Sequence, residues 1–186
     1  MKQKILVIGS ADVNISMDAA QLPEPGETKT DNGSLTVTNG GKASNVAVAM
    51  SRLGAKSVLA ARVGDDAYGK RLMRLYNESK IDTSYVEIDR DFRTGVSVTI
   101  KERDKDARRI LYRGANMNFT PEDALRAMSC EPEAFYVDLE LSYPIAETTL
   151  KYAKRHEIPI FFNASPANKD YPLSSLPALD IFFVSV

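Results

Sequence analysis

The sequence predicts an α/β protein in which helices flank a doubly wound, mostly parallel β-sheet that carries a small antiparallel β lid. Three observations lead to this fold class. Short apolar runs recur along the chain, helical patterns separate them, and two polar alternating segments break the regular order. A chain of 186 residues with 44% hydrophobic composition is long enough to bury a sizeable core, so we expect one α/β domain over residues 1–186.

Five apolar runs predict the strands of the main sheet. Each run is nearly continuous rather than alternating, which is typical of strands that helices cover on both faces. Parallel order follows because helical patterns lie between the runs. The runs occupy residues 4–9, 56–62, 134–139, 159–164 and 180–186.

Four helices are expected between these strands. Val46, Met50 and Leu53 repeat with helical spacing and stop at Gly54. A third helix should begin after Thr120, a suitable cap that precedes a proline and two acidic residues. The other two helices are marked by Leu72, Leu75 and Tyr76 and by residues 144–156.

Residues 13–39 and 94–113 do not fit the alternation of strand and helix. Both segments combine turn residues with polar, alternating stretches, which favours antiparallel strands. We expect them to form a small separate sheet. Such an insertion in an α/β domain is able to cover a ligand at the carboxyl ends of the parallel strands.

Composition narrows the classes of partner. The net charge is −1 with acidic and basic residues interleaved, which argues against a nucleic-acid or anionic-membrane surface. Cys130 and His156 stand alone, so neither a disulfide nor a metal cluster is expected. No apolar stretch approaches 18 residues and the N-terminus lacks a cleavage signal, so we expect a cytoplasmic protein with a small-molecule ligand.

Residues 38–50 place two glycines and a lysine before a predicted helix. A phosphate-binding P-loop would need glycine at position 36 and a hydroxyl residue at position 43, but the chain has Thr36 and Ala43. What remains is a close backbone approach at the glycines, with Lys42 and Asn45 aimed at a polar ligand. A plain glycine turn with a solvated Lys42 is the alternative.

Asp12 and Asn14 lie two residues apart, just beyond the first predicted strand. Residues with this spacing project on the same side, at the edge where open α/β sheets bind ligands. A carboxylate and an amide are suited to fixing sugar hydroxyls. Taken alone, the segment is also compatible with a solvated turn.

The order of motifs along the whole chain resembles the N-terminal portion of ribokinase-like sugar kinases, the phosphofructokinase-B superfamily. The glycine-lysine block after PEPGET, followed by GDDAYG, carries most of the resemblance. The matching motifs, in order, are IGSADVN, PEPGET, NGGKASNVAVAMSRLGA, ARVGDDAYG, TGVSVTI, RGANMNFTPED, DLE and FNASPA.

The resemblance implies a sugar-binding site. The family's first-strand motif is Asn-x-Asp, whereas this chain has the same two residue types in swapped order at Asp12 and Asn14, which puts ribose itself in doubt as the substrate. Asn163 matches an asparagine near the region of phosphate transfer. The remaining family sugar ligands correspond to Gly40, Gly41, Lys42, Asn45 and Glu140.

The resemblance also implies what the lid and the Asp65–Asp66 turn do. The lid segments match a flap that covers the sugar and pairs with a second subunit, so a homodimer through the lid is expected. The VGDD turn is similar in letters to the family's catalytic Gly-Ala-Gly-Asp, but its position matches an earlier strand-to-helix turn. Asp65 or Asp66 is therefore expected to cap a helix.

Phosphoryl transfer needs an anion hole, metal-nucleotide contacts and usually a base. In the family these parts lie in the C-terminal half, which the given sequence does not contain, so ATP and Mg²⁺ are expected only for the complete enzyme. The last apolar run would then leave an uncovered sheet edge that promotes pairing between chains. We therefore expect either a sugar kinase cut short or, alternatively, a noncatalytic carbohydrate-binding or dimerising remnant.

The identity of the substrate is not readable from the sequence. Ribose, another free sugar and a nucleoside all use a hydroxyl-rich pocket of this kind. Arg108, Arg109 and Arg113 in the second lid segment would be able to meet a phosphorylated sugar. We favour a solvated strand face for these arginines.

Overall fold

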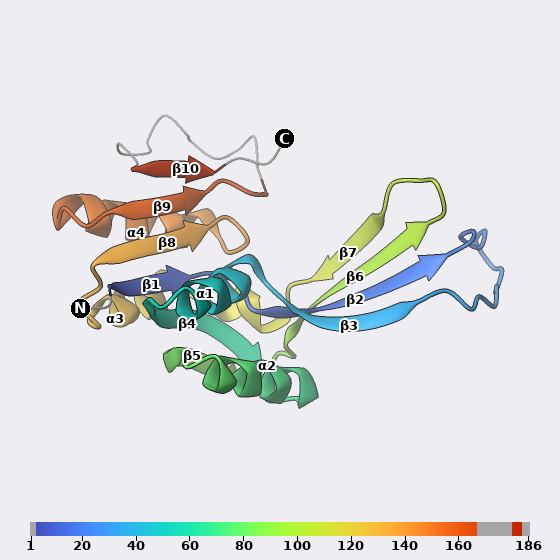
Figure 1. Ribbon diagram of the computed structural model, residues 1–186, viewed down its shortest axis with the longest axis horizontal. Helices are drawn as coiled ribbons and strands as arrows, with labels where there is room; N and C mark the ends of the chain where they lie inside the picture. The colour runs from blue at the N-terminus through green and yellow to red at the C-terminus, as the bar shows by residue number, and fades with distance from the viewer. Residues whose placement is uncertain (1–2, 167–179, 184–186) are drawn as a thin grey trace.

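Among the residues that the structure describes, the main sheet has six strands in the order β10-β9-β8-β1-β4-β5, and every strand pair is parallel (Figure 1). The computed structural model describes residues 3–166 and 180–183. The strands are β1 (Lys4–Ile8), β4 (Lys56–Gly64), β5 (Asp82–Asp89), β8 (Ala134–Asp138), β9 (Ile160–Asn163) and β10 (Ile181–Phe183).

All five predicted strands are confirmed, although the end of the last run, residues 184–186, lies outside the described residues. The structure adds β5, which the sequence analysis missed. Its side chains are mixed in burial because β5 is an edge strand, paired only with β4 among the described strands. Its sequence therefore lacks the continuous apolar run that the central strands need.

In the described part of the chain, four helices cover the two faces of this sheet. α1 (Lys42–Arg52) and α2 (Ala67–Glu78) lie in front of it in Figure 1, whereas α3 (Pro121–Met128) and α4 (Tyr143–Arg155) lie behind. Each pair seals its own apolar core, one around Leu72 and one around Phe135. The main body is thus a three-layer α/β/α arrangement, and the predicted fold class is confirmed.

The residues that α1 buries most deeply are not the ones whose spacing marked it as a helix. Val46 and Met50 are only partly buried and Leu53 is 84% exposed, whereas Ala43 and Ala47 are fully buried. The reason is close approach, because a Cβ atom on Gly9 would lie 2.6 Å from the Cβ of Ala43. Only small residues fit where the start of α1 meets the end of β1.

The predicted helix caps are present. Thr120 forms a reciprocal capping box with Asp123 at the start of α3. Asp66 caps α2 by accepting a hydrogen bond from the backbone N–H of Gly69, as the interpretation of the VGDD turn predicts. The same carboxylate accepts from the backbone N–H and the hydroxyl of Thr94, so it also ties α2 to the base of the lid.

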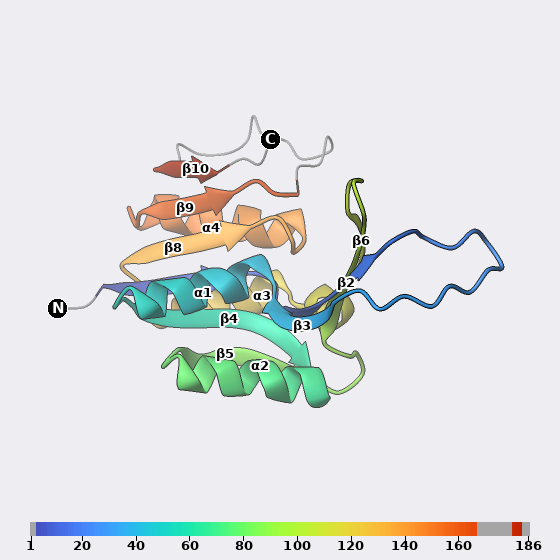
Figure 2. The same ribbon diagram turned by 45° about the vertical axis from the view of Figure 1, so that its right-hand side comes forward.

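The lid is a four-stranded sheet that projects from the main body (Figure 2). Its order is β3-β2-β6-β7. The outer pairs are antiparallel as predicted, but β2 and β6 pair in parallel, because both strands leave the main body in the same direction. The strands are β2 (Asp12–Ala19), β3 (Leu35–Gly40), β6 (Gly95–Glu102) and β7 (Arg108–Tyr112).

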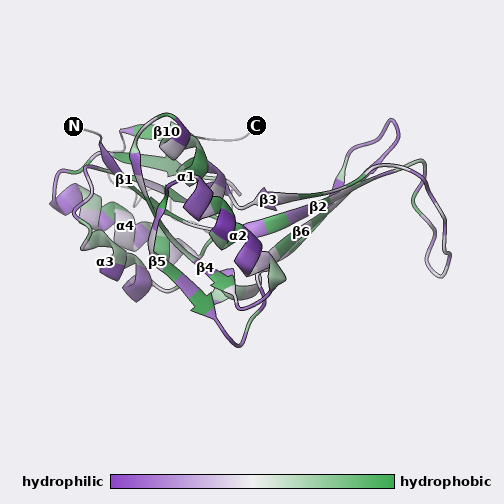
Figure 3. Cartoon of the chain, turned by 60° about the horizontal axis from the view of Figure 1, so that its bottom comes forward, coloured by the Kyte–Doolittle hydropathy of each residue, from purple (hydrophilic) through white to green (hydrophobic). Residues whose placement is uncertain are grey.

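Strand pairing gives the lid two chemically different faces. Residues opposite one another in a sheet share a face. One row across the four strands is Thr38, Asn14, Ser97 and Leu111, and the adjacent row on the other face is Val37, Ile15, Val98 and Ile110. The hydropathy colours alternate along β2 accordingly (Figure 3). We call these the inner, polar face and the outer, apolar face.

A buried asparagine fastens the lid to the main body. Asn116 lies in the short 3₁₀ helix η1 (Gly114–Asn118) that follows β7 and is 4% exposed. Its side-chain oxygen accepts from the backbone N–H of Ala11, and its nitrogen donates to the carbonyl oxygens of Ala11 and Arg113, all at 3.0 Å. The turn between β1 and β2 is therefore held to the end of β7.

Candidate functional site

A cavity of about 590 Å³ opens between the carboxyl ends of the central strands and the inner face of the lid. It lies where β1 meets β8, which is the point at which the strand order reverses. Open α/β sheets bind ligands at this position. Six of the predicted site residues line it: Asp12, Asn14, Gly41, Lys42, Asn45 and Glu140.

A carboxylate clamp organises the floor of this cavity. Glu140 follows β8 and accepts hydrogen bonds from both the backbone N–H (2.9 Å) and the Nζ atom (2.5 Å) of Lys42, the first residue of α1. The hydroxyl of Ser10, in the turn after β1, also donates to Glu140. We call these three residues the Glu140 clamp. It joins the ends of two strands to the start of a helix.

The clamp keeps Glu140 ionised. Burial alone would raise its pKa, but the hydrogen bonds from Lys42 and Ser10 outweigh this and hold the pKa below its ordinary value. The negative charge also lies at the positive end of α1, where no side chain of the Gly41 cap serves that purpose. Glu140 therefore acts as the cap of α1 from a distant part of the chain.

The helix start is not a free anion cradle. The backbone N–H of Lys42 is bound to Glu140 and that of Ser44 is bound to the carbonyl oxygen of Ser10 at 3.1 Å. These two amides are therefore occupied. The failure of the P-loop spacing in the sequence thus has a structural counterpart.

Asp12 is the acceptor of the site that lacks a full set of partners. It is the first residue of β2, it is 4% exposed, and its Oδ1 atom has no hydrogen-bond partner among the described residues. Burial, and then the charge of Glu140, raise its pKa to about 6. At neutral pH it is a carboxylate with one oxygen left for a donor.

Asp138 is a second buried carboxyl group, at the end of β8 beneath the cavity. Its Oδ1 atom accepts from the backbone N–H of Glu140, whereas its Oδ2 atom has no partner among the described residues. Burial, followed by the charge of Glu140, raises its pKa to about 8. At neutral pH the negative charge at the bottom of the cavity is therefore carried by Glu140 and Asp12.

The two glycines at the end of β3 are required by space. A Cβ atom on Gly40 would lie 2.2 Å from Oδ1 of Asp12 and 2.7 Å from the amide nitrogen of Asn14. Gly41 has a φ of 86° and faces the backbone of Ser10, which a Cβ atom would meet at 2.4 Å. Gly40 therefore supports the site from behind rather than lining it.

Asn163 lies apart from the cavity lining. Its side chain donates to the hydroxyl of Tyr136 at 3.1 Å and accepts from the backbone N–H of Ser165. Pro166, shortly after it, does line the cavity. A role of Asn163 near phosphate transfer stays a prediction.

The lid contributes four residues to the cavity that the sequence analysis did not place there. They are Ser97, Arg109, Leu111 and Arg113, all on or next to the inner face. Strand alternation was the available signal, because Arg109 and Leu111 share a face that Arg108 does not. Once Asn14 is assigned to the cavity, its row partners Ser97 and Leu111 follow.

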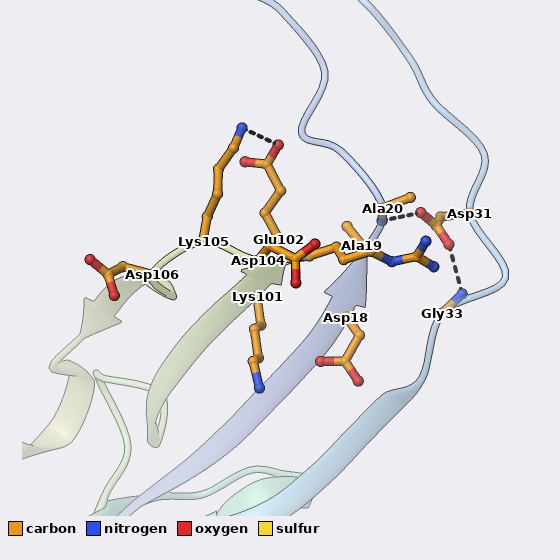
Figure 4. Close-up of a pocket in the computed structure, with 11 residues that line it drawn as sticks. Asp18, Ala19, Ala20, Asp31, Gly33, Lys101, Glu102, Asp104, Lys105 and Asp106 are labelled. Carbon is orange, nitrogen blue, oxygen red and sulfur yellow. Dashed lines mark hydrogen bonds and ion pairs between the residues drawn. The ribbon is translucent and has the colours of Figure 1, made fainter.

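A larger hollow of about 920 Å³ lies at the far tips of the lid strands (Figure 4). Some of its polar groups bind within the loops: Asp31 accepts from the backbone N–H groups of Ala20 and Gly33, and Lys105 pairs with Glu102 at 2.7 Å. These contacts stabilise the loops themselves. The predicted site residues converge instead on the cavity at the switch point.

Other classes of site find little support in the described part of the chain. No group of three or more His, Cys, Asp or Glu residues in residues 3–166 and 180–183 is placed to hold a metal ion. His156 stacks on Tyr152 with a ring separation of 4.2 Å, and Cys130 packs partly buried against the core. None of the described helices is long and apolar enough to cross a bilayer.

The fold and the cavity define a lidded α/β protein with a polar cavity at the carboxyl ends of its central strands. The family model of the pfkB family carbohydrate kinases matches residues 2–186, and the chain belongs to this family.

Individual proteins to which the chain is similar are named as sugar kinases. The chain is 28% identical to a ribokinase of Staphylococcus aureus over 97% of its own length, 31% identical to a ribokinase of Bacillus subtilis over 89%, and 28% identical to a deoxyribokinase of Salmonella typhi over 96%. It spans 60%, 56% and 58% of the length of these three relatives.

Solved structures share the fold. The ribokinase of Giardia lamblia superposes with a TM-score of 0.86 at 23% identity, covering 98% of this chain and 62% of that one. The ribokinase of Arabidopsis thaliana, solved with ribose and ATP, gives a TM-score of 0.80 at 24% identity, covering 89% and 54%. The ribokinase-like fold expected from the sequence is confirmed.

The Glu140 clamp predicts a specific loss of stability. Glu140→Gln removes the charge that both groups of Lys42 bind, so we expect the free energy of unfolding to fall by about 2 kcal/mol in urea titrations. Glu147→Gln breaks the exposed pair with Lys151 and should cost less than about 0.5 kcal/mol. Equal effects of the two variants would contradict a structural role for the clamp.

The raised pKa of Asp12 predicts how the free energy of unfolding changes with pH. The sign is opposite to that expected for an ordinary ion-paired carboxylate. Its folded pKa of about 6 exceeds the unfolded value of 3.8, so the stability it contributes is complete below pH 3.8 and lost as the pH rises through 6. Relative to Asp12→Asn, the wild type should lose about 2–3 kcal/mol across this window. A difference that is flat with pH, measured by urea unfolding, would refute the raised pKa.

Proposed function

We propose that the switch-point cavity binds a sugar through its hydroxyl groups and that the whole protein phosphorylates a sugar hydroxyl with ATP. The convergence of Asp12, Asn14, Lys42, Asn45 and Glu140 on one cavity carries this proposal. The relatives named ribokinase and deoxyribokinase support a sugar substrate.

The chemistry of the lining suits vicinal hydroxyls. A sugar hydroxyl both donates and accepts, and the Oδ1 atom of Asp12 offers an acceptor that has no partner among the described residues. The amides of Asn14 and Asn45 supply donors and acceptors, while Leu111 and Leu139 offer apolar contact. Small polar ligands are commonly fixed by a few such groups in a partly apolar cavity.

Glu140 and Lys42 serve this site in a fixed arrangement. Because each is bound to the other, their remaining hydrogen-bonding capacity is aimed before the ligand arrives. Closure of the lid over the ligand would exclude water from the hydroxyl that is phosphorylated. A hydroxyl-rich lining leaves ribose, another free sugar and a nucleoside as candidate substrates, and the swapped order of Asp12 and Asn14 argues against ribose among them.

ATP and Mg²⁺ belong to the proposal for the whole protein. The residues of this cavity do not fit a metal-nucleotide site, because the oxygens of Glu140 are bound by Lys42 and Ser10, which leaves Asp12 as the remaining carboxylate of the lining. We therefore assign to these residues the binding and orientation of the sugar alone.

The site assignment is tested by binding. Asn14→Ala should weaken the thermal shift produced by the sugar that binds best among ribose, deoxyribose, fructose and adenosine, with affinity falling about 10-fold. Asn39→Ala is the matched control, since Asn39 lies on the neighbouring strand and the outer face. Equal effects, or no shift with any sugar, would count against the site.

The same ligands with Mg-ATP separate the kinase from its alternative. ADP formation that depends on the sugar supports phosphorylation. A sugar-dependent shift without ADP formation supports a noncatalytic carbohydrate-binding module.

We also propose that the outer face of the lid pairs with a second copy of this chain. Ile110 is 77% exposed and ends the row of Val37, Ile15 and Val98, which is apolar across all four strands. Leu35 is 65% exposed and lies opposite Met17 on the same face. A face of this kind is rarely left open to water, and a two-fold pairing lets the same patch cover itself.

The lid dimer predicts a charge-sensitive interface. Ile110→Asp should shift the protein from dimer to monomer in light scattering, because it introduces a charge into the apolar face. Leu53→Asp is the control, since Leu53 is 84% exposed at the end of α1. A wild-type chain that is monomeric at micromolar concentration would exclude the lid dimer.

A further inference from the structure

Two arginines of the lid line the cavity that Asp12 and Asn14 line. Arg109 lies on the inner face of β7, opposite Thr99, and Arg113 follows the end of the same strand. Leu111, which also lines the cavity, lies between them in the sequence. Two guanidinium groups therefore flank an apolar contact on the lid wall of the cavity.

The charges of the lining do not balance. Lys42 and Glu140 neutralise each other at 2.5 Å. Asp12 is then left with two guanidinium groups, and in residues 3–166 and 180–183 no carboxylate lies within 4.0 Å of either arginine. The cavity carries a surplus of positive charge.

The two guanidinium groups are positioned by neutral acceptors. Arg113 donates through Nη2 to the carbonyl oxygen of Glu140 at 2.6 Å, and Arg109 donates through Nε to the hydroxyl of Thr99 at 3.1 Å. Each guanidinium has five N–H groups in a planar fork, so most of its donors remain for a ligand. The forks are held in place while their charges stay uncompensated.

We propose that the cavity takes a sugar that carries an anionic substituent, a phosphate ester or a carboxylate, which Arg109 and Arg113 bind while Asp12 and Asn14 hold the hydroxyls. This inference rests on the proposed function and names its substrate class. Guanidinium forks match both anions with paired, charge-assisted hydrogen bonds.

A neutral sugar would leave the lid wall unsatisfied. When the lid covers a ligand, the guanidinium groups lose water, and an unpaired charge in a dry site is costly. A phosphate or carboxylate supplies the missing counter-charge. Arg108 shows the contrast, since it lies one residue away on the outer face and does not line the cavity.

Matched pairs of ligands test the inference by titration calorimetry on the wild-type chain. The pairs are ribose and ribose 5-phosphate, fructose and fructose 6-phosphate, and glucose and glucuronate, with inorganic phosphate as the sugar-free probe. We expect an anionic member to bind at least about 10-fold more tightly than its neutral parent. The phosphate and uronate pairs distinguish the two sources of charge.

Variants connect the preference to the two arginines. Arg109→Gln and Arg113→Gln should each lower the ratio of anionic to neutral affinity about 10-fold. Arg108→Gln is the matched control and should leave the ratio within about 2-fold. Arg109→Lys, which keeps the charge without the fork, should lower the ratio less than Arg109→Gln.

The outcomes separate this inference from the proposed function. If neutral parents bind as tightly as their anionic partners in every pair, the anionic substrate class is wrong and the sugar site stands. The anionic class is equally wrong if Arg108→Gln and Arg109→Gln change the ratio to the same extent. The anionic class is also wrong if inorganic phosphate binds as well as the sugar phosphates, because the sugar then adds nothing to binding of the anion. If no compound binds, both proposals fail.

Discussion

The Glu140 clamp is the interaction on which the rest of the site depends. One carboxylate joins the turn after β1, the end of β8 and the first residue of α1 through Ser10 and Lys42. A charge this deeply placed is tolerated because several donors satisfy it and because it lies at the positive end of a helix. By fixing these three segments, the clamp determines where Asp12, Gly40 and Gly41 lie. The cavity is a consequence of that arrangement.

The lid is a second sheet, and it also brings residues that are distant in the sequence to the cavity. Its strands alternate polar and apolar residues, so a single set of strands builds a polar wall for the cavity and an apolar outer surface. Asn116 fastens its base to the main body through buried hydrogen bonds, and Asp66 does so through a partly buried one. The lid wall is thereby held in register with the floor of the cavity, which lets groups far apart in the sequence act on one ligand.

Much of the fold was predictable because it follows from local chemistry. Continuous apolar runs marked the central strands, and Thr120 and Asp66 were recognisable as caps from their neighbours. β5 escaped because an edge strand needs fewer apolar side chains, and the burial of Ala43 and Ala47 on α1 was not foreseen because the close approach to Gly9 selects small residues there. In both cases the deciding factor was a neighbour distant in the sequence, which residue periodicity does not reveal.

The sequence by itself determined the fold class, the family and six residues of the cavity lining, because these depend on residue types at the ends of predictable elements. Tertiary structure decided what those residues do. It occupied Lys42 with Glu140, left Oδ1 of Asp12 without a partner among the described residues, and directed Arg109 and Arg113 into the cavity. The physical reason is that the hydrogen-bond partners of a side chain and the charge balance around it are set only in the assembled site, where strands that are distant in the sequence meet.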